Sequence, residues 1–130
     1  MAKVRLAGSI IEHVLECDRG LPPEDQTTLK LKCLNYDEWR QFMGILERVG
    51  RGSSAQEALE AARKVIGIGL VSVSNLKIFD EGTTNTRDFE LTKIGTELTK
   101  ESMCVLMPWK QEIIEAIGAA SQLTVGDLKN

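Results

Sequence analysis

The sequence has few of the residues from which catalytic and metal sites are usually built. Its 130 residues include one histidine, His13, and three cysteines, Cys17, Cys33 and Cys104. The cysteines are odd in number and widely spaced, which is typical of reduced cytosolic thiols and not of a disulfide framework or a zinc site. A nucleophilic triad would have to use His13, and nothing near it is marked as a nucleophile. The sequence therefore predicts no catalytic residue, no cofactor and no metal ligand.

Long apolar runs and a strong excess of charge are also missing. The longest uncharged stretch, 65–76, is interrupted by Gly, Ser and Asn, whereas a membrane span needs about twenty mostly apolar residues. The apolar run that follows the first residues is too short for a secretory signal. Sixteen Lys and Arg against nineteen Asp and Glu make a net charge of −3, which does not favour binding to a phosphate backbone. We therefore expect a cytoplasmic protein that binds neither nucleic acid nor a membrane.

Two short motifs resemble ion-binding loops only in part. Asp80, Glu81, Asp88 and Glu90 surround a glycine-containing loop, but threonines stand where a calcium loop needs its next ligands. The segment 50–54 is rich in glycine and serine, but a P-loop has a longer pattern with a lysine and follows a strand, whereas this segment follows a helical pattern. We interpret the first as a solvated loop and the second as a helix C-cap joined to an N-cap.

The first part of the chain, 1–34, is predicted to be extended. Residues 10–16 fit either a short strand or a helical turn, and their periodicity does not decide between the two. Residues 18–25 contain two prolines and are predicted to form a loop. Residues 27–33 alternate between apolar side chains and lysines, which predicts a half-buried strand. The side chains expected on its buried face are Leu29, Leu31 and Cys33.

Residues 35–69 are predicted to form an antiparallel pair of helices. Asn35 with Glu38, and Ser54 with Glu57, make capping-box patterns. Each helix has one apolar stripe, and the short connection favours a helical hairpin. The stripes consist of Trp39, Phe42, Met43, Leu46 and Val49 in the first helix and of Ala58, Leu59, Ala62, Val65 and Ile66 in the second.

Residues 70–98 are predicted to form a strand and a loop, and 99–130 the C-terminal helices. Pro108 stands where it would start or kink a helix, and Ser121 or Thr124 is expected to cap one last turn. The whole chain, 1–130, is predicted to be one domain of mainly α structure with a small β element (α+β). It would comprise an N-terminal strand or hairpin, the antiparallel helix pair and the C-terminal helices.

The C-terminal helices carry an apolar surface that a partner protein could cover. The segment 116–126 holds eleven uncharged residues near the end of the chain. Part of this surface is expected to stay exposed until a partner covers it, as a helix is covered in a groove. Core packing is the alternative for its isoleucines. The predicted partner-binding residues are Trp109, Ile113, Ile117, Leu123, Val125 and Leu128.

Two stretches resemble the tail assembly chaperones of tailed phages. Residues 23–39 pass from an alternating strand into 34–38 (LNYDE), similar to the L-[ST]-x-x-E helix start of small phage morphogenesis proteins, with Asn in place of Ser or Thr. The ending 121–130 (SQLTVGDLKN) is similar to the pattern S-x-L-[ST]-x-x-[DE]-x-K-N. The loop 82–86 departs from the family by being longer.

The resemblance implies a helper in virion morphogenesis that is absent from the finished particle or minor in it. Such a protein coats the tape measure protein and recruits tail tube subunits in the host bacterial cytoplasm, by reversible binding and without enzymatic activity. The alternative is a structural virion component, such as a head–tail connector or a minor tail protein. The sequence leaves open whether the protein is a monomer or self-associates weakly.

Overall fold

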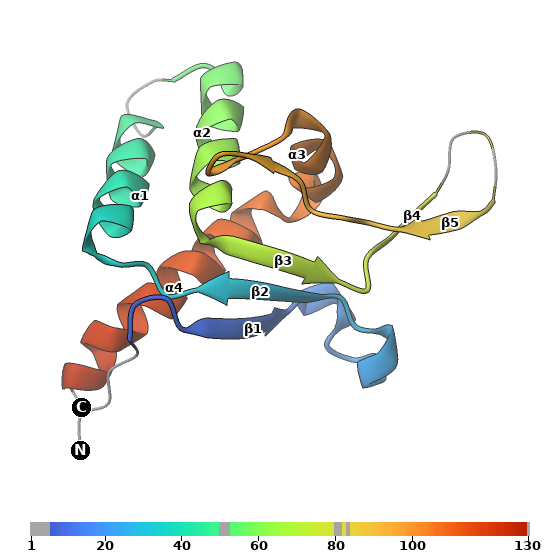
Figure 1. Cartoon of the computed structure of the whole chain (residues 1–130), viewed down its shortest axis with the longest axis horizontal. Coiled ribbons are helices and arrows are strands. Elements are labelled where there is room, and N and C mark those ends of the chain that lie inside the picture. The colour runs from blue at the N-terminus through green and yellow to red at the C-terminus, as the bar shows by residue number, and fades with distance from the viewer. Residues whose placement is uncertain (1–5, 50–52, 80–81, 83, 130) are drawn as a thin grey trace.

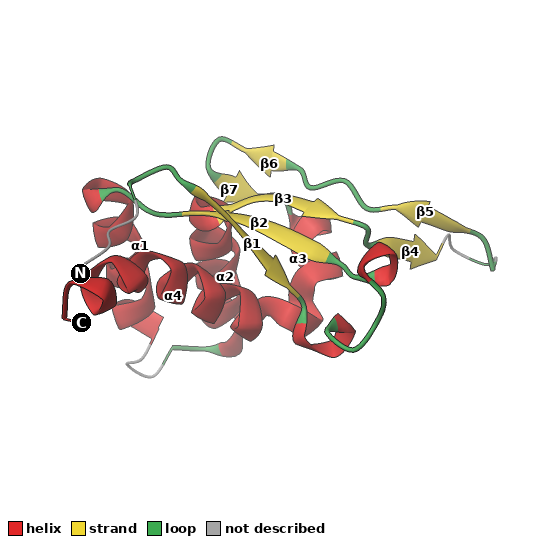
Figure 2. Ribbon diagram, turned by 90° about the horizontal axis from the view of Figure 1, so that it is seen from below, coloured by secondary structure: helices red, strands yellow, loops and turns green. Residues whose placement is uncertain are grey.

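Strands and helices form two layers, which the view from below separates clearly (Figure 2). The computed structural model describes the backbone of residues 6–49, 53–79, 82 and 84–129, and their side chains up to residue 121. The fold is of the mixed α+β class, as predicted. In the described part of the chain, no helix has both the length and the apolar character that crossing a bilayer requires.

The central sheet is antiparallel and has the strand order β1-β2-β3. Its strands are β1 (Ile10–Val14), β2 (Thr28–Lys32) and β3 (Leu70–Ser74). The segment whose sequence fits both a strand and a helical turn is therefore a strand as far as residue 14. β2 lies in the middle and pairs with both neighbours, so the sheet joins the first and second halves of the chain.

The alternation predicted for β2 is confirmed. Leu29 and Leu31 are each 1% exposed and Cys33 is 2% exposed, whereas the lysines between them lie toward the opposite face. The proline-containing connection from β1 to β2 forms two short 3-10 turns, η1 (Glu16–Asp18) and η2 (Pro23–Asp25). The alternation of apolar residues and lysines matches the alternation in burial, because helices cover one face of the sheet and the other face is open.

Helices α1 (Tyr36–Val49) and α2 (Ala55–Gly69) form the predicted pair, and the ribbon shows that they run antiparallel (Figure 1). α2 continues directly into β3, so it carries the chain from the helical layer into the sheet. The helix pair lies beside one end of the sheet (Figure 1). Part of α1 faces the last helix, α4 (Lys110–Lys129).

Both helix starts use the predicted caps. The N–H of Glu38 donates to Asn35 Oδ1 over 2.8 Å, and the N–H of Asn35 donates to Glu38 Oε1 over 3.1 Å. At α2, the N–H of Glu57 donates to Ser54 Oγ over 3.2 Å. These bonds satisfy backbone donors that have no partner within the helix. The predicted C-cap at Gly50 lies outside the described residues.

Two small hairpins follow the sheet. β4 (Lys77–Phe79) pairs with β5 (Thr86–Asp88), and this hairpin projects from the rest of the molecule (Figure 1). β6 (Lys93–Ile94) pairs with β7 (Glu97–Leu98) across a turn in which Gly95 has a φ of +64°. The predicted strand of this region is thus β3 together with β4, and the predicted loop contains the three short strands that follow.

The C-terminal region begins with α3 (Lys100–Leu106), which starts after the Thr99 cap. Pro108 interrupts the helical path as predicted: it lies in the 3-10 turn η3 (Met107–Trp109), after which α4 (Lys110–Lys129) begins. α4 crosses behind the sheet (Figure 1) and packs against β2 and α2.

The prediction of a separate last turn after Ser121 or Thr124 is wrong, because α4 continues without a break to Lys129. Ser121 lies inside the helix and is 8% exposed. Its hydroxyl accepts a hydrogen bond from the N–H of Leu34 over 3.1 Å. The serine therefore binds α4 to the connection between β2 and α1 and does not cap a new helix.

One buried cluster combines side chains from all four predicted segments of the chain. Ile113 and Ile117 belong to it and are 0% exposed. The expectation that they form a partner-binding surface is therefore corrected: they lie on the face of α4 that packs into the core. Other members are Leu15, Leu29, Leu31, Phe42, Val65, Ile66, Leu70, Leu98, Met103 and Leu106.

Candidate functional site

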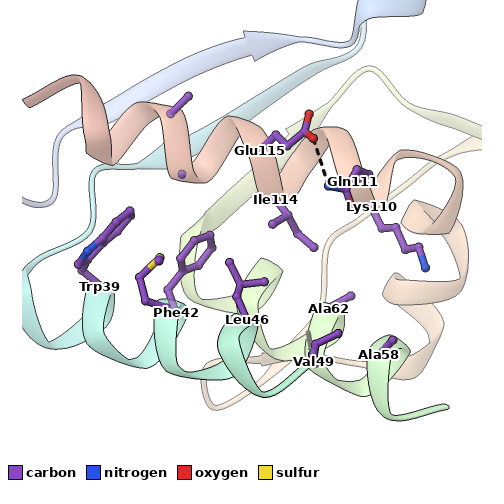
Figure 3. Close-up of a pocket in the computed structure, with 14 residues that line it drawn as sticks. Trp39, Phe42, Leu46, Val49, Ala58, Ala62, Lys110, Gln111, Ile114 and Glu115 are labelled. Atoms are coloured by element: carbon purple, nitrogen blue, oxygen red, sulfur yellow. Dashed lines mark hydrogen bonds between the residues drawn. The ribbon is translucent and has the colours of Figure 1, made fainter. Parts of the chain in front are cut away.

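An open groove of about 520 Å³ lies between α1, α2 and α4. In Figure 3, α1 and α4 form its two walls, and Ile114 points from α4 toward the side chains of α1. The residues that line it are Trp39, Phe42, Met43, Leu46 and Val49 from α1, Ala58, Ala61 and Ala62 from α2, and Lys110, Gln111, Ile114, Glu115, Gly118 and Ala119 from α4.

The groove is open because small side chains of α2 and α4 face the large apolar side chains of α1. The α2 wall consists of alanines, and α4 contributes Gly118 and Ala119. A Cβ atom at Gly118 would lie 3.9 Å from Phe42 Cε1, an ordinary contact distance, so even a methyl group would fit there. These small residues leave space that no described side chain fills.

The apolar stripe of α1 is divided between the core and the groove. Phe42 is 2% exposed and belongs to the core, whereas Trp39, Met43 and Leu46 are only partly buried. The Trp39 and Phe42 rings stack with centroids 5.6 Å apart and an angle of 19° between their planes. The core therefore fixes the Phe42 ring, and the Phe42 ring supports the Trp39 ring at the end of the groove.

Polar groups line the α4 side of the groove. Gln111 Nε2 donates to Glu115 Oε1 over 3.1 Å, and Lys110 lies at the opposite end from Trp39 (Figure 3). An apolar floor with charged groups at its margin suits the apolar stripe of an amphipathic helix, which buries its large side chains and leaves its polar face in water.

Of the partner-binding residues predicted from the sequence, the three with described side chains, Trp109, Ile113 and Ile117, do not line the groove. Trp109 is half-buried in η3 and packs against the core, and Ile113 and Ile117 are core residues, as described above. Leu123, Val125 and Leu128 lie beyond the described side chains. The sequence predicted the groove residues of α1 only as the apolar stripe of a helix and did not identify them as a binding surface. The signal that could have found them is the set of alanines and glycine on α2 and α4.

His13 holds β1 against α4. Its Nε2 lies 2.7 Å from Glu112 Oε2, and the same oxygen accepts a hydrogen bond from the N–H of Glu16 over 2.9 Å. Both side chains of the His13–Glu112 pair are 19% exposed. One carboxylate oxygen thus joins the first turn of α4 to the end of β1 and the beginning of η1, which is a structural role.

The thiol of Cys17 is not activated. Partial desolvation, then the neighbouring Asp18 carboxylate, raises its pKa above the ordinary value, Glu112 adds to this, and a hydrogen bond with Trp109 only partly opposes it. A thiol with a raised pKa stays protonated at neutral pH, whereas a reactive cysteine needs a lowered one.

No ion site emerges from the part of the chain that the structure describes. Within it, no group of three or more His, Cys, Asp or Glu side chains is placed to hold a metal ion. The two motifs that partly resemble ion-binding loops include residues 50–52, 80–81 and 83, which lie outside the described part.

No protein-family model, no curated protein and no solved structure matches this chain.

Proposed function

We propose that this protein is a phage tail assembly chaperone of the host bacterial cytoplasm. It reversibly coats the tape measure protein and recruits tail tube subunits. The observation that carries the proposal is the open groove between α1, α2 and α4, whose apolar side chains the chain leaves partly exposed. Exposed apolar surface of this kind on a small protein is typical of a binding site.

The groove suits a long helical partner. A tape measure protein is a long helical chain with apolar stripes, and these would aggregate before the tail tube encloses them. A groove of about 520 Å³ accepts a few large side chains of such a stripe. Each contact is therefore weak, but many copies along one helix would gain avidity and still be displaced during tube assembly.

Co-expression with the tape measure protein encoded by the same phage tests the proposal. The wild type should co-purify with it. Met43→Glu places a charge in the groove, where no partner group balances its desolvation, and should reduce the amount recovered by about tenfold or more. Gln41→Glu adds the same charge to the exposed face of α1 and should leave recovery unchanged, with circular dichroism confirming that both variants fold.

Two outcomes would contradict the proposal. Equal recovery with Met43→Glu and with the wild type would exclude the groove as the binding site. Failure of the wild type to co-purify with the tape measure protein and with tail tube protein would exclude the chaperone function itself.

A structural virion component is the second candidate, and the projecting β4–β5 hairpin favours it. Phe79 in this hairpin is 74% exposed, and arms that project from a subunit are suited to holding neighbouring subunits together. Mass spectrometry of purified particles separates the two candidates, because a connector or minor tail protein is present in fixed copy number and a chaperone is missing.

A further inference from the structure

The outer side of β1 is a free edge of the sheet within the described part of the chain. β1 pairs with β2 alone, and the N–H of Leu15 donates to the carbonyl of Thr27 over 3.2 Å at the end of this ladder. Because hydrogen bonds alternate along an antiparallel ladder, the backbone groups of Ile10, Glu12 and Val14 point away from β2. β1 forms the lower margin of the sheet in Figure 1 and lies toward the viewer in Figure 2.

A hollow of about 300 Å³ lies beside this edge, between β1 and α4. β1 and α4 thus form the two walls of the hollow, and the free backbone groups belong to the β1 wall. Its apolar lining consists of Ile11, Leu31, Ala116, Ala119 and Ala120, and its polar lining consists of Glu12, His13, Glu16, Glu112 and Glu115.

The polar lining of the hollow is acidic. Among the described residues it includes four glutamates and no lysine or arginine, and of these four only Glu112 forms an ion pair with a described residue, His13. Glu115 accepts a hydrogen bond from the neutral amide of Gln111. Lys30 lies opposite Glu12 in the sheet register, so both side chains belong to the open face of the sheet. Glu16, Glu112 and Glu115 are therefore the acidic side chains on the α4 side. The hollow therefore favours a cationic occupant.

We propose that the β1 edge binds an extended, basic segment of another protein as a fourth strand of the sheet. Its backbone would pair with the free groups of β1, as in other strand additions to a sheet edge. Alternate residues of a strand point to the same face, so the face toward α4 would carry a basic, an apolar and a basic residue in turn. The basic side chains would meet the glutamates, and the apolar one would enter the hollow.

A second copy of this chain fits the edge poorly. Pairing two β1 edges would bring two acidic linings together, and like charges across a strand pair are destabilising. Glu115 and Ala119 line both the hollow and the groove between α1, α2 and α4. Among the described residues that line the groove, however, none belongs to β1, so this inference does not depend on the proposed function.

Fluorescence anisotropy with a labelled, end-blocked peptide tests the inference. The probe is Thr-Lys-Thr-Val-Thr-Lys-Thr, and two matched peptides serve as controls. One carries Glu in place of each Lys, and the other is N-methylated at the backbone nitrogens that would face β1. We expect the lysine peptide to bind and both controls to bind about tenfold more weakly or worse. Added salt should weaken the lysine peptide, since charge attracts it.

Variants of the protein test the same contact from the other side. Glu12→Pro removes an outward-facing N–H, which an edge strand tolerates, and should weaken the lysine peptide about tenfold relative to Glu12→Thr, which keeps that N–H. The double variant Glu16→Gln with Glu115→Gln should weaken it at least about threefold. Met43 lines the groove but not the hollow, so Met43→Glu should leave peptide affinity unchanged.

Several results would overturn the inference. They are no binding of the lysine peptide to the wild type, equal binding of either control peptide, and equal affinity of Glu12→Pro and Glu12→Thr, with unfolding midpoints confirming that the variants fold. A wild-type dimer in light scattering that Glu12→Pro converts to a monomer would assign the edge to a second copy and overturn it as well.

Discussion

Glu38, at the start of α1, is held by contacts that affect its pKa in opposite directions. Burial raises the pKa of its carboxyl, but the ion pair with Lys32 and the N–H of Asn35 lower it more, so its pKa lies below the ordinary value. The unfolded chain therefore binds this proton more readily than the folded protein does. The resulting stability is present in full above the unfolded pKa of about 4.3 and is lost as the pH falls through the folded pKa.

We predict that Glu38→Gln lowers the free energy of unfolding at pH 7 by about 1 kcal/mol or less, because an ion pair near the surface contributes no more than that. The difference from the wild type should shrink as the pH falls below about 4.3 and vanish once both states are protonated. Urea titrations between pH 7 and about pH 2 measure this. Glu47→Gln, on the exposed face of the same helix, is the control, and a difference that stays constant down to pH 2 would contradict the prediction.

Among the elements, α2 depends on a close approach to the β6–β7 hairpin. A Cβ atom at Gly67 would overlap the carbonyl oxygen of Thr96 and lie 3.0 Å from both Glu97 Cα and Leu98 N. The carbonyl of Gly67 also accepts a hydrogen bond from Lys93 Nζ over 2.9 Å. Because the obstructing atoms belong to the backbone, a larger residue would have to move the hairpin and not only a side chain.

Gly67→Ala should therefore destabilise the protein by about 1–3 kcal/mol, the usual cost of overpacking, although alanine is the better helix former by about 1 kcal/mol. Gly44→Ala is the matched control, since a Cβ atom at this position in α1 would meet nothing within 4 Å. This control should be neutral or stabilising by up to about 1 kcal/mol. Urea denaturation at pH 7 compares the two, and equal stabilisation by both would show that the hairpin yields without cost.

The whole molecule divides into a packed body and a projecting arm. The buried cluster lies between the central sheet and the helices, whereas every residue of β4 and β5 except Ile78 is exposed. Lys77 and Asp88 form an ion pair across the arm. A two-stranded hairpin is marginal in water by itself, so the arm adds little to the stability of the body.

Two phenylalanines test this division. Phe42→Ala should cost about 3–5 kcal/mol of unfolding free energy, as expected for a buried phenylalanine, because Phe42 is 2% exposed. Phe79→Ala, in the arm, should change it by less than about 0.5 kcal/mol. Denaturant unfolding followed by tryptophan fluorescence compares them, and a large loss from Phe79→Ala would mean that the arm packs against the body.

Local patterns predicted the elements well. The caps at Asn35 and Ser54, the alternation of Leu29 and Leu31 and the break at Pro108 all depend on residues a few positions apart, so they can be read from the sequence. Ser121 could not be interpreted in this way, because its partner Leu34 is distant in sequence and nearby only in the fold.

The two helices of the pair, β2 and the break at Pro108 could be predicted from the sequence, because backbone hydrogen bonds and side-chain period are local properties. Which apolar faces are covered depends on how these elements pack. The packing buries Ile113 and Ile117 and leaves Trp39, Met43 and Leu46 beside an open groove. A groove depends on the summed volumes of side chains from three helices, so only the packed structure shows that the alanines of α2 and the small residues of α4 leave that volume unfilled by the described side chains.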